Sequence, residues 1–156
     1  LHLLSRRQRQ MCIRDRLITP HFAVGTCDDE GNLLEAFEYP MVEQTVSSQT
    51  SENMKYILTQ VVSEGGGKNG QVEGYNVGGK TATSEKLPRG NGKYISSYIG
   101  FAPADDPQVI AICLINEPVG IYYGGTIAAP VVRSIFENIL PYLGVDKSDE
   151  KPYNQT

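Results

Sequence analysis

The residues with the most obvious chemical potential lie in the stretch Gly74–Thr81, GYNVGGKT. A glycine, four arbitrary residues and then Gly-Lys-Thr is the spacing of a phosphate-binding loop. Such a loop needs a buried strand before it and a helix that starts at the Lys-Thr pair, so that backbone amides cradle the phosphates. Here the preceding stretch is polar, and Pro88 with two nearby glycines would interrupt a helix within about three turns. We therefore do not expect nucleotide binding.

The same lysine and threonines fit an extended strand better. The run VGGKTATSE is followed by a turn-rich loop and then by YISSYIGFA, which alternates and is rich in aromatic and β-branched residues. In a strand, Thr81 and Thr83 share one face, and Lys80 and Ala82 share the other. A strand at the edge of a sheet also offers free N–H and C=O groups to an extended peptide. We expect Lys80 to lie on such an edge strand.

Further elements complete an α+β pattern. Two strand-like runs around DDEGN predict a hairpin, and MVEQTV predicts a short extended piece. Apolar spacing predicts one helix over 50–64, capped by Ser48 or Thr50 and ended by three glycines, and a second over 126–143. The run over 108–115 is apolar at nearly every position, so we expect a central strand there, next to the strand over 94–102. Short connections require antiparallel neighbours, which predicts an antiparallel sheet with flanking helices.

Composition narrows the classes of partner. The 156 residues carry a formal charge of -4, but residues 1–16 hold five Arg and one Asp. The rest of the chain therefore has nine basic and seventeen acidic side chains, a net charge of -8, which argues against nucleic acid as a partner. No apolar run approaches the roughly 20 residues that cross a bilayer. Cys12, Cys27 and Cys113 have no spacing typical of a metal site or a disulfide framework, so neither is expected.

Three stretches together resemble a known family. VGGKTATSE, GFAPADDP and YGGTIAAPVVR are similar to the C-terminal part of the transpeptidase domain of class B penicillin-binding proteins, including the stage V sporulation protein D type. The resemblance covers about Ile18–Val145. It implies a partial penicillin-binding protein transpeptidase (β-lactamase-like) fold. It also implies that the strand with Lys80 forms one wall of the active-site cleft.

The resemblance also assigns roles along that strand. Lys80 would place positive charge beside a serine nucleophile. Thr81 and Thr83 would bind the carboxylate of a D-Ala-D-Ala peptide or a β-lactam, with Gly79 and Ala82 in the same substrate-binding strand. The backbone N–H of Thr83 would be an oxyanion donor. Ala82 departs from the family pattern, which usually has glycine at this position.

The nucleophile itself is expected to be absent from this chain. The family's nucleophilic serine stands three residues before a lysine, upstream of this segment. We expect no serine of this chain to stand at that spacing, because Ser84 precedes Lys86 by only two residues. Ser51-Glu52-Asn53 imitates the family's second motif, Ser-x-Asn, but lies too close to Lys80, so we interpret it as the polar start of the first helix.

The ends of the chain are expected to differ from its body. LHLLSRRQRQMCIRDR resembles translated adapter sequence, so we interpret residues 1–16 as a non-native segment rather than a basic arm or a targeting peptide. Residues 17–145 would be the C-terminal part of the transpeptidase domain, and residues 146–156 a polar tail.

The function implied by the resemblance is peptidoglycan D,D-transpeptidation by serine acylation in the intact parent, without a metal or cofactor, and with this fragment inactive alone. The partners would be stem peptides, β-lactams and a cell-wall synthesis complex. A missing N-terminal anchor would hold the domain on the extracytoplasmic face of the membrane. Two alternatives stay open: a serine β-lactamase or D,D-carboxypeptidase relative, and a non-catalytic penicillin-sensing module.

Overall fold

The computed structural model describes residues 16–17, 21–39, 42–44 and 46–147. They divide into two compact units, Leu1–Glu52 and Asn53–Thr156, each of which is described by itself. The proposed division into 1–16, 17–145 and 146–156 stays a prediction, since most of both ends lies outside the described residues.

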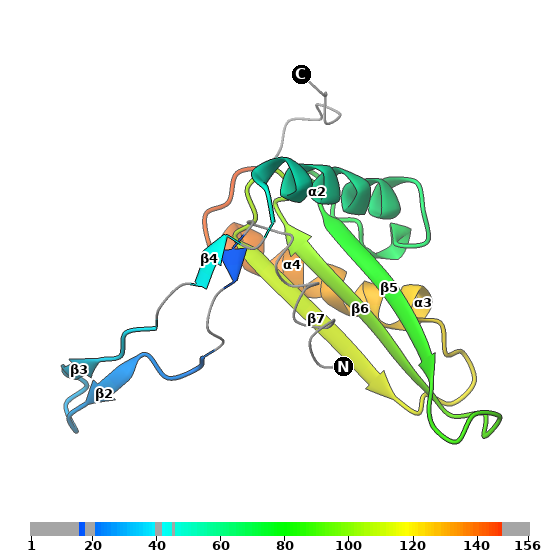
Figure 1. The fold of residues 1–156 in the computed structure, drawn as a ribbon, viewed down its shortest axis with the longest axis horizontal. Helices are drawn as coiled ribbons and strands as arrows, with labels where there is room; N and C mark the ends of the chain where they lie inside the picture. The colour runs from blue at the N-terminus through cyan, green and yellow to red at the C-terminus, as the bar shows by residue number, and fades with distance from the viewer. Residues whose placement is uncertain (1–15, 18–20, 40–41, 45, 148–156) are drawn as a thin grey trace. The chain divides into compact units, whose positions relative to one another are not determined.

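The first unit contains two small antiparallel pairs (Figure 1). Strand β1 (Arg16–Leu17) pairs with β4 (Val42–Gln44), and β2 (Gly25–Cys27) pairs with β3 (Leu33–Ala36). The hairpin expected around DDEGN is therefore confirmed. Its turn is organised by one aspartate, because Oδ1 of Asp28 accepts the backbone N–H groups of Glu30 at 3.0 Å and Asn32 at 2.8 Å.

Helix α2 (Ser48–Ser63) starts two residues before the predicted helix. Its N-terminus is capped by Ser47, whose Oγ accepts the backbone N–H of Thr50 at 3.1 Å. The prediction that Ser48 or Thr50 caps this helix is therefore wrong: both residues are inside the helix. The three glycines do end it, and a short 3-10 helix, η2 (Lys68–Gly70), follows.

The main sheet of the second unit has three antiparallel strands in the order β5-β6-β7. Strand β5 (Gly78–Glu85) carries Lys80 and lies at an edge of this sheet beside β6 (Tyr94–Ala102), as predicted. The expectation that the run over 108–115 is central is wrong. Among the described strands, β7 (Val109–Asn116) lies at the opposite edge and β6 is central.

The physical reason for this error lies in the faces of β7. Its residues alternate between a half-buried set, which includes Ala111 and Cys113, and a more exposed apolar set, Ile110, Ile112 and Leu114. An apolar run indicates that the faces of a strand are apolar. It does not indicate whether one or two neighbouring strands pair with the strand's edges. Within the described residues, only one face of β7 packs against the hydrophobic core.

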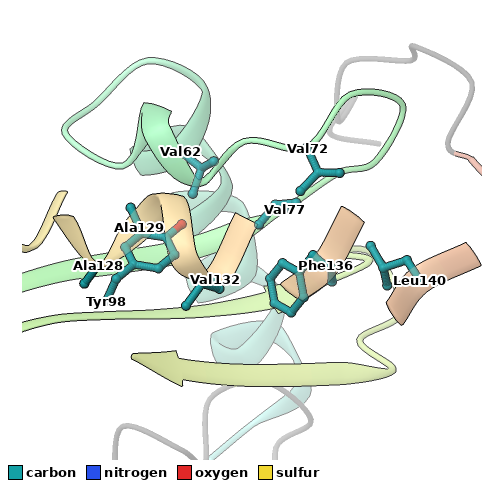
Figure 2. Packing of buried hydrophobic residues seen from close by; sticks show 10 residues of the cluster. Val62, Val72, Val77, Tyr98, Ala128, Ala129, Val132, Phe136 and Leu140 are labelled. Carbon is teal, nitrogen blue, oxygen red and sulfur yellow. The ribbon is translucent and has the colours of Figure 1, made fainter. Parts of the chain in front are cut away.

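The second predicted helix is two helices, α3 (Gly124–Ile127) and α4 (Ala129–Tyr142). Pro130 explains the interruption, because it has no N–H to continue the hydrogen-bond pattern from α3, yet it fits in the first turn of α4. Helix α4 covers one face of the sheet, as expected (Figure 1). Val132, Phe136 and Leu140 are fully buried there (Figure 2).

Tyr98 is the largest fully buried side chain of this core. Its ring and hydroxyl occupy the space beside Gly70 and Gly79, where a Cβ atom would lie 2.3 Å from the Tyr98 hydroxyl oxygen at either position. That hydroxyl has no hydrogen-bond partner within the described part of the chain. Burial raises the pKa of Tyr98 to about 12.

A second close approach joins α3 to the sheet. A Cβ atom on Gly124 would lie 2.3 Å from the carbonyl oxygen of Ser97 and 2.5 Å from that of Ala82. A Cβ atom on Gly125 would lie 2.6 Å from the carbonyl oxygen of Gly66. Gly124 therefore lets the start of α3 lie directly against the backbone of β5 and β6, and Gly125 lets it approach the backbone at Gly66.

The first prediction concerns the Tyr98 hydroxyl. Tyr98→Phe should leave the free energy of unfolding unchanged or raise it by up to about 2 kcal/mol, because a buried hydroxyl without a partner is unfavourable. The matched control is Tyr75→Phe, which removes a hydroxyl that donates to the carbonyl oxygen of Val145 at 3.2 Å and should lower stability by about 1 kcal/mol. Urea denaturation measures both. A loss above about 1 kcal/mol for Tyr98→Phe would show that the hydroxyl has a partner, such as a buried water.

The second prediction concerns Gly124. Gly124→Ala should lower the free energy of unfolding by about 1–3 kcal/mol, because the methyl group meets backbone atoms that have little room to move. Gly66→Ala is the control, since nothing lies within 4 Å of its added Cβ atom and its φ is not positive. Its change should stay within about 1 kcal/mol. Equal effects of the two substitutions would contradict the close packing of α3 on the sheet.

Candidate active-site strand

The four residues Lys80-Thr81-Ala82-Thr83 lie on β5, whose other long edge pairs with no described strand. Thr81 is paired with Tyr98, whose ring lies in the core, so both threonines belong to the sheet face that is covered by α3 and α4. Lys80 is paired with Ile99 and therefore shares the opposite face with Ala82. The predicted division of this motif between two faces is confirmed.

The extended path continues to Glu85, and no helix begins at Lys80. A phosphate-binding loop needs a helix N-terminus at that point. The geometry therefore agrees with the expectation that this Gly-Lys-Thr spacing does not form a nucleotide site.

Lys80 has an exposed side chain that folds back on its own strand. Its Nζ donates to the carbonyl oxygen of Thr81 at 2.9 Å and lies 3.5 Å from the Thr81 hydroxyl oxygen. One cation and one hydroxyl group are therefore adjacent on an accessible strand. Together they can attract and hydrogen-bond a carboxylate.

Thr83 is held by the start of α3. Its hydroxyl oxygen accepts the backbone N–H of Gly124 at 3.1 Å. A hydroxyl that accepts one hydrogen bond keeps its own proton, so Thr83 can still donate to a ligand. The close packing of Gly124 thus determines where this hydroxyl lies.

Gly79 and Ala82 have different surroundings. Gly79 is buried, and its missing side chain makes room for Tyr98. Ala82 is exposed, so its methyl group does not press on a neighbouring element. Gly79 is therefore primarily a packing residue in this structure, whereas Ala82 lies at the accessible surface.

A connecting loop completes the surroundings of the strand. The ring of Tyr122 stacks on Tyr94 with centroids 4.1 Å apart, and the Ser96 hydroxyl donates to the carbonyl oxygen of Tyr122. Tyr123 is 59% exposed. The structure shows that Tyr122 packs on β6.

Ser84 lies on β5 itself, two residues before Lys86. Ser51 lies near the start of α2, in the first of the two units. The expectation that no Ser-x-x-Lys spacing exists needs one correction, because Ser148 precedes Lys151 by three residues. Both lie outside the described residues, in the polar tail that follows Lys80 instead of upstream of it.

Neither a metal cluster nor a membrane span is found in the part of the chain that the structure describes. No group of three His, Cys, Asp or Glu side chains there could hold a metal ion. No described helix combines the length and the apolar character that spanning a bilayer requires.

Comparison with known proteins extends the geometric description. Residues 13–137 match the family model for the penicillin-binding protein transpeptidase domain. The chain is 42% identical over 134 residues to stage V sporulation protein D of Bacillus subtilis, which covers 83% of this chain and 21% of that protein. It is 37% identical to a probable peptidoglycan D,D-transpeptidase PenA of Neisseria flavescens, over 75% of this chain and 30% of that protein.

Solved structures agree with these relatives. The transpeptidase domain of penicillin-binding protein 3 from Burkholderia pseudomallei superimposes with a TM-score of 0.72 and 28% identity, covering 94% of this chain and 43% of that domain chain. The chain thus spans less than half of the length of each of these three proteins. The fold, the family model and the curated relatives lead to one assignment: the chain belongs to the penicillin-binding protein transpeptidase family, and within it to the class B proteins.

Proposed function

We propose that this chain forms one wall of the active-site cleft of a serine D,D-transpeptidase that cross-links peptidoglycan. The observation that carries the proposal is the position of Lys80, Thr81 and Thr83 on the accessible edge strand β5, with the Thr83 hydroxyl anchored to Gly124. The substrates would be stem peptides that end in D-Ala-D-Ala. β-Lactams would bind at the same place, because they present a comparable carboxylate beside a reactive carbonyl group.

The direction of the backbone supports a role in transition-state binding. The Thr81 carbonyl oxygen accepts a hydrogen bond from Nζ of Lys80, which favours an orientation of this carbonyl group toward the unpaired edge of β5. Along an antiparallel strand, alternate residues direct their backbone groups to the same side. The N–H of Thr83 would then also face the cleft, where it can stabilise the oxyanion that forms during acyl transfer.

Lys80 would act electrostatically beside the nucleophile. A fixed positive charge favours the developing negative charge of the transition state more than the neutral ground state. The nucleophilic serine would come from a part of the parent protein that precedes this segment. No metal or other cofactor is required for this route of acylation.

The cellular setting is part of the proposal. Peptidoglycan cross-linking takes place outside the cytoplasmic membrane, so the parent would work on the extracytoplasmic face, held by an N-terminal anchor. Partners in a cell-wall synthesis complex fit this setting. Ala82, which replaces the usual glycine, keeps a non-catalytic penicillin-sensing module as the second candidate.

The third prediction tests whether this chain can be acylated alone. Incubation with a fluorescent penicillin should leave no covalent label on a denaturing gel, because the cleft lacks its serine nucleophile. Ser148→Ala is the matched variant, since Ser148 is the serine that stands three residues before a lysine. A band lost in Ser148→Ala would place the nucleophile in the tail, and a band retained there would reveal another nucleophile. Either outcome would overturn the proposal for this chain.

The fourth prediction concerns the motif in the longer parent protein. Ala82→Gly should change the second-order acylation rate by less than about tenfold, roughly 1.4 kcal/mol of barrier, because the methyl group of Ala82 is exposed. Lys80→Ala should lower the rate by about a hundredfold or more, because it removes a preorganised charge. A chromogenic β-lactam measures both rates. A hundredfold gain for Ala82→Gly would instead favour a crippled or sensing member of the family.

A further inference from the structure

One carboxylate joins the end of β7 to both ends of the β5–β6 hairpin loop. Oε1 of Glu117 lies 2.5 Å from Nζ of Lys86, and Oε2 lies 3.2 Å from Nζ of Lys93. Lys86 directly follows the last residue of β5, and Lys93 directly precedes β6. The Glu117 carboxylate therefore links the two ends of the loop over 86–93.

Further backbone and side-chain hydrogen bonds hold the ends of this loop to the end of β7. The N–H of Glu117 donates to the carbonyl oxygen of Tyr94 at 2.8 Å, and the N–H of Lys86 donates to that of Lys93 at 2.8 Å. Nζ of Lys86 also donates to Oδ1 of Asn116 at 3.2 Å. Hydrogen bonds with Lys86, and then with Lys93, hold the pKa of Glu117 below its usual range.

The backbone conformation of Glu117 indicates that the turn alone does not account for a glutamate at this position. Its φ is +51°, in the left-handed region, and it is the one non-glycine residue with positive φ among those described. Glycine or asparagine adopts this conformation with less strain. Glutamate at such a position indicates that the side chain contributes something that a glycine would not.

The same connection reaches the motif strand at a second point. From Glu117 the chain runs to Gly124, whose N–H donates to the Thr83 hydroxyl at 3.1 Å. The segment from Thr83 to Lys86 is therefore tied at both ends to one connection, between β7 and α3. Figure 1 shows the hairpin loop and this connection at the same end of the sheet.

We infer that Glu117 is a positioning residue that clamps the β5–β6 hairpin and so fixes the direction of the strand that carries Lys80 and Thr83. The clamp acts on the edge strand that no described strand supports on its other side. Its effect on acylation rests on the proposed function, whereas its effect on the hairpin does not.

The fifth prediction tests the hairpin in this chain. An arginine-specific protease cleaves after Arg89, which is exposed in the loop. Glu117→Gln and Glu117→Gly should each speed this cleavage by about fivefold or more, because cleavage follows local opening. Glu137→Gln is the matched control, because it removes the ion pair of Glu137 with Arg133 on α4 and should change the rate by less than about twofold.

The substitution Glu117→Gly distinguishes a clamping role of the Glu117 side chain from a role of this residue in the turn alone. Glycine relieves the positive φ, so a residue that serves only the turn would give unchanged or slower cleavage after this substitution. That result would overturn the inference. Glu117→Asp keeps a carboxylate and tolerates the left-handed conformation, so its cleavage rate should stay within about threefold of the native rate.

A second measurement in the longer parent protein separates this inference from the proposed function. Glu117→Gly should lower the first-order acylation constant by about tenfold, with the dissociation constant of the β-lactam changed by less than about threefold, because misplaced oxyanion donors affect the transition state most. Glu117→Asp should restore the constant. If the parent protein is never acylated, the proposed function is refuted. The cleavage assay then still tests whether Glu117 clamps the hairpin. An acylation constant that stays unchanged while cleavage accelerates refutes the positioning role.

Discussion

The arrangement of the motif strand depends on the central position of β6. This strand pairs with β5 from Tyr94 to Phe101 and with β7 from Ile95 to Ala102. It also provides Tyr98, which fills the space between the sheet and α4. Because β5 has no described neighbour on its other side, its position is determined by β6, by the start of α3 and by the connection that precedes α3.

Small residues make this arrangement possible. Gly79 leaves room for the Tyr98 ring, and a Cβ atom on Gly78 would lie 2.2 Å from the ring of Phe101. Gly124 lets α3 lie against the backbone of the sheet, and Gly125 lets it lie against the backbone at Gly66. Large aromatic side chains of this core thus lie opposite glycines, as expected where the packing density is close to that of a crystal. The glycines before and after the motif serve packing, while Lys80 and Thr83 remain accessible.

The combination of packing glycines with an accessible Lys80 and Thr83 is consistent with the family assignment. A strand edge can bind an extended peptide through its free backbone groups, and catalysis in general needs donors and charge at fixed places. Rigid elements position such groups more accurately than loops do. In this chain a central strand and a short helix hold the accessible strand, and the family relatives share the fold in which they do so.

Local sequence patterns were sufficient for much of the fold. Alternation in YISSYIGFA and the glycine-rich turns predicted the strands, and the short connections predicted antiparallel pairing. The face division of Lys80 and Thr83 followed from the period of a strand alone. The resemblance of three stretches to class B penicillin-binding proteins gave the family, which the family model and the curated relatives confirm.

Tertiary structure decided what depends on contacts between distant residues. The apolar run of β7 did not reveal an edge position, because burial of a face and pairing of an edge are separate properties. Pro130 divided a predicted single helix, and Ser47 rather than Ser48 capped the first helix, since propensity alone does not locate helix ends. The contact of Gly124 with Thr83 and the bridge from Glu117 to two lysines join residues about 24 to 41 positions apart. No local pattern encodes such contacts, because they exist only once the sheet has brought the strand ends together.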